Sequence, residues 1–320
     1  DTKLQHVDTT PSHRHAPLHD LHCQKWRNRP RTARNGYSHR RDAALFSLIP
    51  VPTMPILAID DPKDPRLADY HNVPDPILLH QRGVFVAESR LVVRALLAHP
   101  RLLTRSLLTT QAALASLGDL LRHRRDQLPI YVGSPRVLQD VVGFHVHRGC
   151  LALGERPAEV TDTQLAPLRA ARLVVVLEQV ANPDNVGSVF RNAAAFGVQC
   201  VLLSPQCSDP LYRKAIRTSL GATLRIPYAV VDDWPEGLTR LNELGYTTVA
   251  LTPGAETEPL DTFVQTAPPR VAVVLGTEGS GLSDEAAVRV SRQVRIPIAP
   301  GVDSLNVATA LAIVVSGALR

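Results

Sequence analysis

The chain has few cysteines and no long apolar run, and both shortages restrict what it can be. Its four cysteines form no CxxC pair and have no histidines at matching spacing, so the sequence supports no zinc site and predicts buried, reduced thiols. No stretch of about 18 apolar residues occurs, which excludes a membrane-spanning helix. Residues 1–20 lack the apolar core of a signal peptide. We therefore expect a soluble cytoplasmic protein without a bound metal.

Residues 54–320 also lack a surplus of charge. The net charge of +5 comes from residues 1–53, which hold nine of the 35 Lys/Arg and four of the 30 Asp/Glu, so 26 of each sign remain. The overall charge therefore does not indicate what the folded part binds.

Residues 1–53 carry six of the twelve histidines and show neither helical nor strand periodicity. Met54 is the only methionine of the chain. We interpret Met54 as the natural start and residues 1–53 as a disordered or non-native leader. A basic tail that tethers RNA is the alternative interpretation, and the mass of the native N-terminus distinguishes the two.

The remaining sequence contains two blocks of alternating strand and helix patterns. Residues 54–154 predict a small α/β domain, and the proline-containing stretch 155–170 predicts a linker. Residues 171–320 contain longer Val/Ile/Leu strands, which are typical of a parallel sheet with helices on both faces. The expected strands are 83–89, 105–110, 128–134 and 149–155 in the first block and 172–180, 198–204, 223–231, 246–253, 270–276 and 293–299 in the second; the expected helices of the first block are 89–100, 111–125 and 135–143.

The first of three unusual polar segments follows strand 172–180. Asn182 and Asp184 are good capping residues for a helix from Asn185 to Phe196. Gly187 lies inside this helix, where glycine costs about 1 kcal/mol relative to alanine. A partner is therefore expected to approach its backbone closely. By itself the segment is equally compatible with a capped helix that carries one solvated arginine, Arg191.

The second segment is a glycine-rich turn after strand 270–276, with Glu278 at its centre. It matches neither GxxxxGK[ST] nor GxGxxG, so it gives little support for binding a nucleotide phosphate. The third segment follows strand 293–299 and leads into an apolar helix for which Ser304 is the expected N-cap. Capping does not account for Asn306, two residues later.

In the order NxxNxGxxxRNA, LGxEGxGL and IPxxxxxxSLNVAxA, the three segments resemble the SpoU family of RNA ribose 2′-O-methyltransferases, within the SPOUT superfamily. The resemblance covers residues 171–320. It implies a C-terminal trefoil knot that binds S-adenosylmethionine, a homodimer with the active site near its interface, and no metal. The implied catalytic residues are Asn185, Arg191, Glu278, Ser304 and Asn306, and the implied cofactor-binding residues are Leu275, Gly276, Gly281, Ile296 and Leu305.

Two roles are open for Arg191. In such families an arginine at this position is described as the proton acceptor, but an arginine side chain has an intrinsic pKa above about 12 and is a costly base. An electrostatic role, in which the guanidinium stabilises the forming alkoxide or grips a phosphate, is the one we favour.

The first block resembles the ribosomal-protein-like substrate-binding domain that often precedes SpoU domains. Family members usually have Glu-Gly where this chain has Glu88-Ser89, and His-Gln-Gly at residues 147–149, where this chain has His-Arg-Gly. Arg82, Arg90 and Arg94 are candidates for contacts with RNA phosphates, although each is also explained as a solvated surface charge.

The sequence therefore predicts an S-adenosylmethionine-dependent RNA 2′-O-methyltransferase, with ribosomal RNA favoured over transfer RNA. A catalytically silent RNA-binding or ribosome-assembly protein of the same fold is an alternative, as is, more weakly, a nicotinamide-dependent enzyme that uses the glycine-rich turn.

Overall fold

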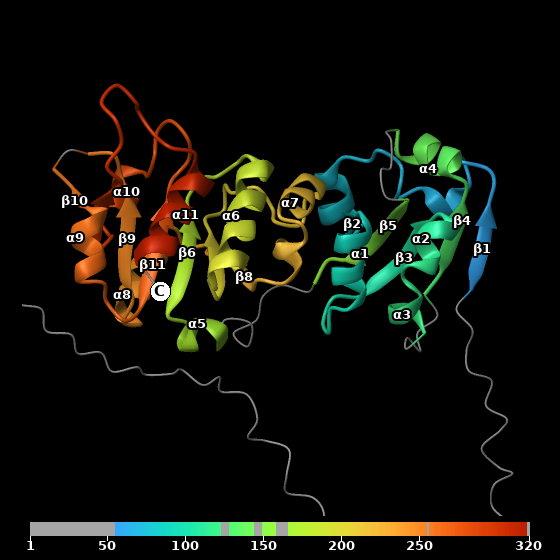
Figure 1. Cartoon of the computed structure of the whole chain (residues 1–320), viewed down its shortest axis with the longest axis horizontal. Helices are drawn as coiled ribbons and strands as arrows, with labels where there is room; N and C mark the ends of the chain where they lie inside the picture. Colours follow the sequence, from blue (N-terminus) through green and yellow to red (C-terminus); the bar gives the residue numbers. More distant parts are fainter. Residues whose placement is uncertain (1–54, 123–127, 144–148, 158–165, 255, 319–320) are drawn as a thin grey trace, which may run out of the picture. The chain divides into compact units, whose positions relative to one another are not determined.

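The structure of the chain is a computed structural model, shown in Figure 1, and it describes residues 55–122, 128–143, 149–157, 166–254 and 256–318. The expected leader, 1–53, and residues 158–165 of the expected linker lie outside the described residues. Within the described ranges, no helix combines the length and the apolar character that crossing a bilayer requires.

Five strands between residues 56 and 155 form a mixed sheet in the order β1-β4-β3-β5-β2. β1, β4 and β3 run parallel, whereas β5 runs antiparallel to both β3 and β2. The four predicted strands are confirmed, but β1 was not predicted, because so short a run has no decisive periodicity. The strands are β1 (Ile56–Ile59), β2 (Val84–Glu88), β3 (Thr104–Thr109), β4 (Ile130–Gly133) and β5 (Cys150–Glu155).

Helices connect these strands largely where the apolar periodicity predicts them. The helix expected at 111–125 is interrupted, because α2 ends at Ala115 and α3 begins at Gly118. Ser134 caps α4 by accepting a hydrogen bond from the Val137 amide at 3.2 Å. The helices are α1 (Arg90–Leu97), α2 (Gln111–Ala115), α3 (Gly118–Leu121) and α4 (Pro135–Val142), with a 3₁₀ turn at Pro65–Leu67 and a π turn at Ile77–Gln81.

Ser89, between β2 and α1, adopts a backbone conformation that suits glycine, with φ 83° and ψ 151°. A residue other than glycine lowers the stability of the folded state by about 1–3 kcal/mol when it adopts this backbone conformation. The family resemblance places a glycine at this position. We predict that Ser89→Gly raises the free energy of unfolding by about 1 kcal/mol, measured by urea denaturation. As a control, Ser134→Gly removes a helix cap at φ −67° and should lower stability slightly. A lower free energy of unfolding in Ser89→Gly would contradict the interpretation that the Ser89 backbone is strained.

The second sheet has seven strands, all parallel, in the order β10-β12-β9-β11-β6-β7-β8. The predicted parallel α/β arrangement is confirmed. The strand expected at 223–231 is shorter than predicted, because a 3₁₀ turn occupies Ala222–Leu224 and Pro227 has no amide hydrogen to donate. The strands are β6 (Leu173–Leu177), β7 (Cys200–Leu203), β8 (Tyr228–Val230), β9 (Thr247–Leu251), β10 (Glu258–Pro259), β11 (Val271–Leu275) and β12 (Arg292–Arg295).

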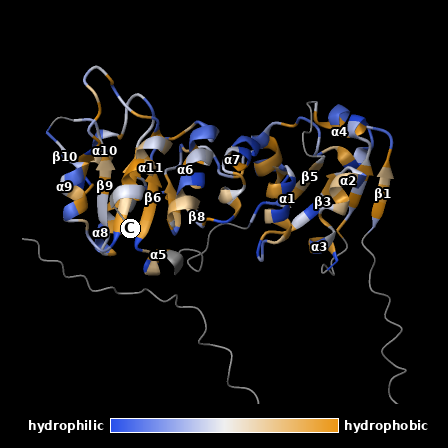
Figure 2. Cartoon of the chain, viewed as in Figure 1, coloured by the Kyte–Doolittle hydropathy of each residue, from blue (hydrophilic) through white to orange (hydrophobic). Residues whose placement is uncertain are grey.

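The central strand β6 is buried on both faces, which explains its unbroken apolar sequence. Successive strand residues point to opposite faces of a sheet. Leu173, Val175 and Leu177 join a cluster with α6 and α11. Val174 and Val176 join a second cluster on the other face, with residues of α8. Figure 2 shows β6 in the hydrophobic colour, while helices such as α4 also carry hydrophilic residues.

Seven helices, within the described residues, connect and cover this sheet. α11 packs against both α6 and α9. The helices are α5 (Ala166–Ala170), α6 (Pro183–Phe196), α7 (Arg213–Thr218), α8 (Glu236–Glu243), α9 (Leu260–Gln265), α10 (Asp284–Ala287) and α11 (Val307–Ala318).

The expected close approach at Gly187 is confirmed, and the partner is α7 of the same chain. A Cβ atom at Gly187 would lie 2.6 Å from the Ala215 carbonyl oxygen. The same two helices are joined at Asp184, which accepts a hydrogen bond from Thr218 Oγ1 at 2.8 Å and pairs with Lys214 Nζ at 2.8 Å. The hydrogen bond from Lys214 lowers the pKa of Asp184. The N-cap of α6 is Asn182, which accepts from the Asp184 amide.

Two of the cysteines are buried, as predicted. Burial raises the pKa of the Cys150 and Cys200 thiols to about 12, so they stay protonated at neutral pH. Cys207 is half-buried, and its thiol donates to the Leu177 carbonyl at 3.2 Å.

Candidate active site

The three unusual polar segments meet at one edge of the seven-stranded sheet. α6 follows β6, the glycine-rich turn follows β11, and α11 follows β12. The carboxyl ends of parallel strands lie at the same edge of a sheet, which is where α/β proteins place their ligand sites. Three regions far apart in the sequence are therefore brought within contact distance.

Asn306 joins these segments through its side-chain amide. Its Nδ2 donates to Asn185 Oδ1 on α6 at 3.0 Å and to Glu278 Oε1 in the turn at 2.9 Å. Asn185 is 8% exposed, whereas Glu278 and Asn306 are exposed. The structure thus brings three of the predicted site residues together, and the cluster presents a carboxylate and an amide to solvent.

The cap of α11 is Asn306, so the prediction that Ser304 caps this helix is wrong. Asn306 Oδ1 accepts from the amides of Ala308 and Thr309 at 3.0 and 3.3 Å. The helix begins at Val307, and a capping side chain must directly precede the first helical residue. Ser304 lies in an irregular segment and is exposed.

Arg191 is exposed on α6, and its guanidinium has no hydrogen-bond or ion-pair partner within the described ranges. It lies six positions after Asn185, which places the two side chains about 120° apart around the helix. The next residue, Asn192, does reach α11: its Nδ2 donates to the Ala308 carbonyl at 2.7 Å. α6 is thus fastened to the first turn of α11, and Arg191 is free to contact a ligand.

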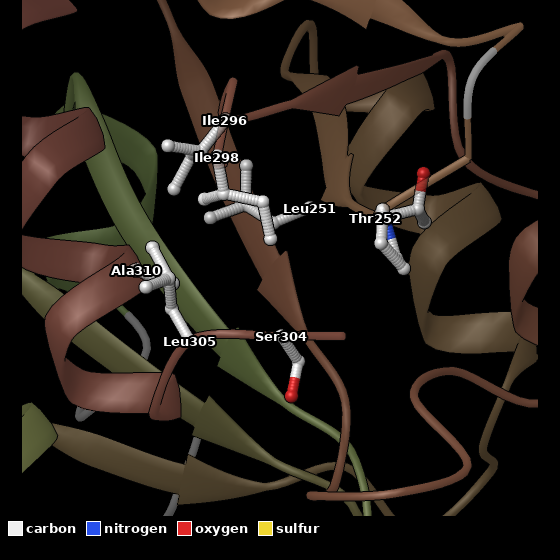
Figure 3. A pocket seen from close by; sticks show the side chains of 8 residues that line it. Leu251, Thr252, Ile296, Ile298, Ser304, Leu305 and Ala310 are labelled. Carbon is white, nitrogen blue, oxygen red and sulfur yellow. The ribbon is translucent and has the colours of Figure 1, made fainter. Parts of the chain in front are cut away.

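An apolar pocket of ≈ 430 Å³, including the space at its open mouth, lies beside this cluster. Figure 3 shows Leu251, Ile296 and Ile298 gathered at one side, with Leu305 and Ala310 at the other. The lining residues are Leu251, Thr252, Pro253, Ile296, Ile298, Ser304, Leu305 and Ala310. A largely apolar lining with a few polar groups is typical of small-molecule sites.

The predicted cofactor-binding residues fall into two groups. Ile296 and Leu305 line the pocket. Leu275, Gly276 and Gly281 are not among its lining residues and instead shape the turn. A Cβ atom at Gly276 would lie 2.2 Å from the Gly281 carbonyl carbon, so the glycine is required for the two arms of the turn to pack.

The sequence interpretation missed Glu178, which directly follows β6 and is 1% exposed. Its carboxylate accepts from Trp234 Nε1, Ser283 Oγ and the Ser283 amide at 2.7, 2.7 and 2.9 Å. Glutamate is almost never fully buried without partners. An acidic residue at the end of an otherwise apolar strand was therefore the signal that pointed to it. Throughout the described ranges, no three His, Cys, Asp or Glu side chains are grouped to hold a metal.

The three arginines proposed to contact RNA differ in their surroundings. Arg82 pairs with Asp69 at 2.6 Å, and Arg94 pairs with Asp119 at 2.6 Å. The Arg94 hydrogen bond holds the pKa of Asp119 at about 2. Arg90 is exposed and makes no ion pair with the described residues. Contacts between phosphates and Arg82 or Arg94 would compete with these exposed pairs, which are individually weak.

Comparison with known proteins gives matches that include all three polar segments of the candidate site. The family model described as the SpoU rRNA Methylase family matches residues 172–316. Uncharacterized tRNA/rRNA methyltransferases of Mycobacterium bovis and Mycobacterium tuberculosis are each 41% identical over 259 residues, covering 79% of this chain and 88% of the relative.

Solved structures are similar over both sheets. The SpoU methyltransferase AviRb from Streptomyces viridochromogenes, in complex with AdoMet, aligns with a TM-score of 0.67 and 21% identity over 80% of this chain and 98% of that one. An RNA 2′-O ribose methyltransferase aligns with a TM-score of 0.64 and 25% identity over 83% of this chain and 98% of that one.

Proposed function

The chain belongs to the SpoU rRNA Methylase family of RNA methyltransferases, which use S-adenosylmethionine, and we propose that it methylates a ribose 2′-hydroxyl, preferentially in ribosomal RNA. The observation that carries this proposal is the contact of Asn306 with both Asn185 and Glu278, at 3.0 and 2.9 Å, directly beside an apolar pocket. A polar cluster next to an apolar pocket suits a reaction between a hydroxyl group and a cofactor with an adenine ring.

The residues of the pocket fit the cofactor chemically. The side chains of Leu251, Ile296 and Ile298 offer an apolar surface to an aromatic base. Leu305 lies next to Asn306, so a group bound in the pocket reaches the polar cluster. We propose that the segments around it form a trefoil knot. The position of β12 between β10 and β9, and the packing of α11 back onto α6, support this.

When bound, S-adenosylmethionine supplies a methyl group on a positively charged sulfur. In our proposal, Glu278 and Asn306 orient the ribose by hydrogen bonds to its hydroxyls, and Asn185 fixes the Asn306 amide. Holding two reactants in line contributes about 7–11 kcal/mol to lowering a barrier. Ser304, at the pocket and exposed, is placed to contact either the ribose or the cofactor.

Arg191 is assigned the electrostatic role. In the transfer, the ribose oxygen would lose its proton and gain the methyl group, while the bond between the methyl carbon and the sulfur breaks and leaves a neutral thioether. Partial negative charge would develop on the oxygen before its bond to the methyl carbon is complete. A guanidinium without a partner among the described residues can stabilise this charge or grip the adjoining phosphate. We expect the proton to leave to solvent, to which Arg191 is exposed.

We further propose that the residues of the first sheet form an RNA-binding domain and that the protein is a homodimer. The similarity of both sheets to AviRb and to a ribose methyltransferase supports the domain. Of the three predicted arginines, Arg90 is the one that makes no ion pair with described residues, so it is the one of these three we expect to contact phosphates. The dimer rests on the family resemblance, and sedimentation equilibrium tests it.

The experiment that tests the substrate is methyl transfer from labelled S-adenosylmethionine to separated ribosomal and transfer RNA. We expect label on ribosomal RNA. Label on transfer RNA alone would keep the activity and overturn the preference. If neither RNA is labelled although the protein binds both RNA and cofactor, the catalytically silent RNA-binding protein becomes the better account.

A further inference from the structure

We propose that Glu178 is a positioning residue that fixes the shape of the glycine-rich turn, residues 276–282, and thereby the cofactor pocket and Glu278. The inference rests on the proposed function, because it concerns the same site. Glu178 touches neither the pocket nor the polar cluster, so it acts through the turn.

Glu178 holds both arms of the turn. Its backbone amide donates to the Leu275 carbonyl, where the turn begins, at 2.9 Å. Its carboxylate accepts from the Ser283 amide and hydroxyl, where the turn ends, at 2.9 and 2.7 Å. One residue at the end of β6 therefore sets the separation of the two arms.

The side-chain oxygens of Glu178 act as hydrogen-bond acceptors in all of these contacts. All three hydrogen bonds reach it from donors, since Ser283 contributes an amide and a hydroxyl and Trp234 contributes its indole N–H. A glutamine at this position would turn an amide NH₂ toward one of these donors. At 1% exposure, water is not available to replace a lost partner.

The turn between the two arms carries the groups that the reaction uses. Thr277 and Gly281 exchange two backbone hydrogen bonds of 3.1 Å, which fold the turn back on itself. Glu278, between them, is exposed and meets Asn306 at 2.9 Å. Ser283 anchors the end of the turn that carries Glu278, so a displacement of Ser283 is expected to move Glu278 as well.

The test compares cofactor affinity and stability in the full-length chain. Calorimetric titration with S-adenosylhomocysteine should show a dissociation constant raised about tenfold in Glu178→Gln and in Ser283→Ala. Trp234→Phe leaves both Ser283 contacts in place, so a smaller rise is expected. Each variant is titrated well below its melting temperature, so that a weaker affinity cannot result from partial unfolding of the protein.

The matched control is Tyr246→Phe. The Tyr246 hydroxyl donates to the Leu168 and Ala171 carbonyls at 2.6 and 2.9 Å, on a part of the sheet that does not touch the turn. This variant should melt at a lower temperature and bind S-adenosylhomocysteine as the wild type does. General destabilisation is thereby separated from the positioning effect.

Unchanged affinity in both Glu178→Gln and Ser283→Ala, with normal binding by the wild type, would overturn the inference and leave the proposed function standing. If Glu178→Gln does not fold, the dissociation constant of Ser283→Ala for S-adenosylhomocysteine alone tests the inference. Failure of the wild type to bind S-adenosylhomocysteine would instead contradict the proposed function and, with it, this inference.

Discussion

Replacing Arg191 with alanine is expected to lower the rate of methyl transfer by about 10²–10³-fold, the usual effect of removing one group that stabilises developing charge. The dissociation constant for S-adenosylhomocysteine should not change, because Arg191 does not line the apolar pocket. Stability should also be unchanged, since the exposed side chain makes no hydrogen bond or ion pair with the described residues. Single-turnover rates with saturating RNA measure this effect.

The control is Arg191→Lys, which keeps the positive charge and loses the planar fork. Part of the activity should return with lysine if Arg191 acts electrostatically, because an ammonium group carries the same charge. Equal loss in the lysine and alanine proteins would contradict a role for positive charge alone and show that the planar guanidinium itself is needed. Wild-type rates in Arg191→Ala would remove Arg191 from the mechanism.

Replacing Asn306 with alanine should damage stability and activity together. The change removes the N-cap of α11, which is worth about 1 kcal/mol. It also removes the donor to Asn185 and Glu278, leaving the buried Asn185 oxygen without this partner. We expect urea denaturation to show the first loss and methyl-transfer assays to show a fall of about 10²-fold for the second.

Asn306→Ser separates the two effects. A serine hydroxyl caps a helix about as well as asparagine, so stability should return toward the wild-type value. It is too short to reproduce both amide contacts, so the activity should stay low. Full activity in Asn306→Ser would show that the link between Asn185 and Glu278 is not needed for catalysis.

The parts of the fold that depend on long apolar runs were predictable from the sequence. The run from Leu173 to Leu177 is apolar at every position because both faces of β6 are covered, and this pattern identifies a parallel sheet. The grouping of Asn185, Glu278 and Asn306 was predictable only through resemblance to a family. Spacing alone gives no distance between residues that are 121 positions apart.

The features that the sequence did not reveal depend on tertiary contacts. Ser304 and Asn306 are both good capping residues, and only the path of the chain after β12 decides that Asn306 is the cap. Glu178 can be singled out in the sequence as an acidic residue that ends an apolar strand, but its donors Trp234 and Ser283, which are 56 and 105 positions away, cannot be identified from the sequence. The short strands β1 and β10 form because neighbouring strands pair with them.

The central claim, methylation of a ribose hydroxyl, is tested most directly by digesting the methylated RNA to nucleosides. RNA is treated with the wild-type protein and labelled S-adenosylmethionine, hydrolysed enzymatically, and separated by chromatography with mass detection. We predict that the label is found in a single 2′-O-methylnucleoside, at one position that resists alkaline cleavage. Label attached to a base would contradict the account, because the chain would then be an RNA methyltransferase of different chemistry.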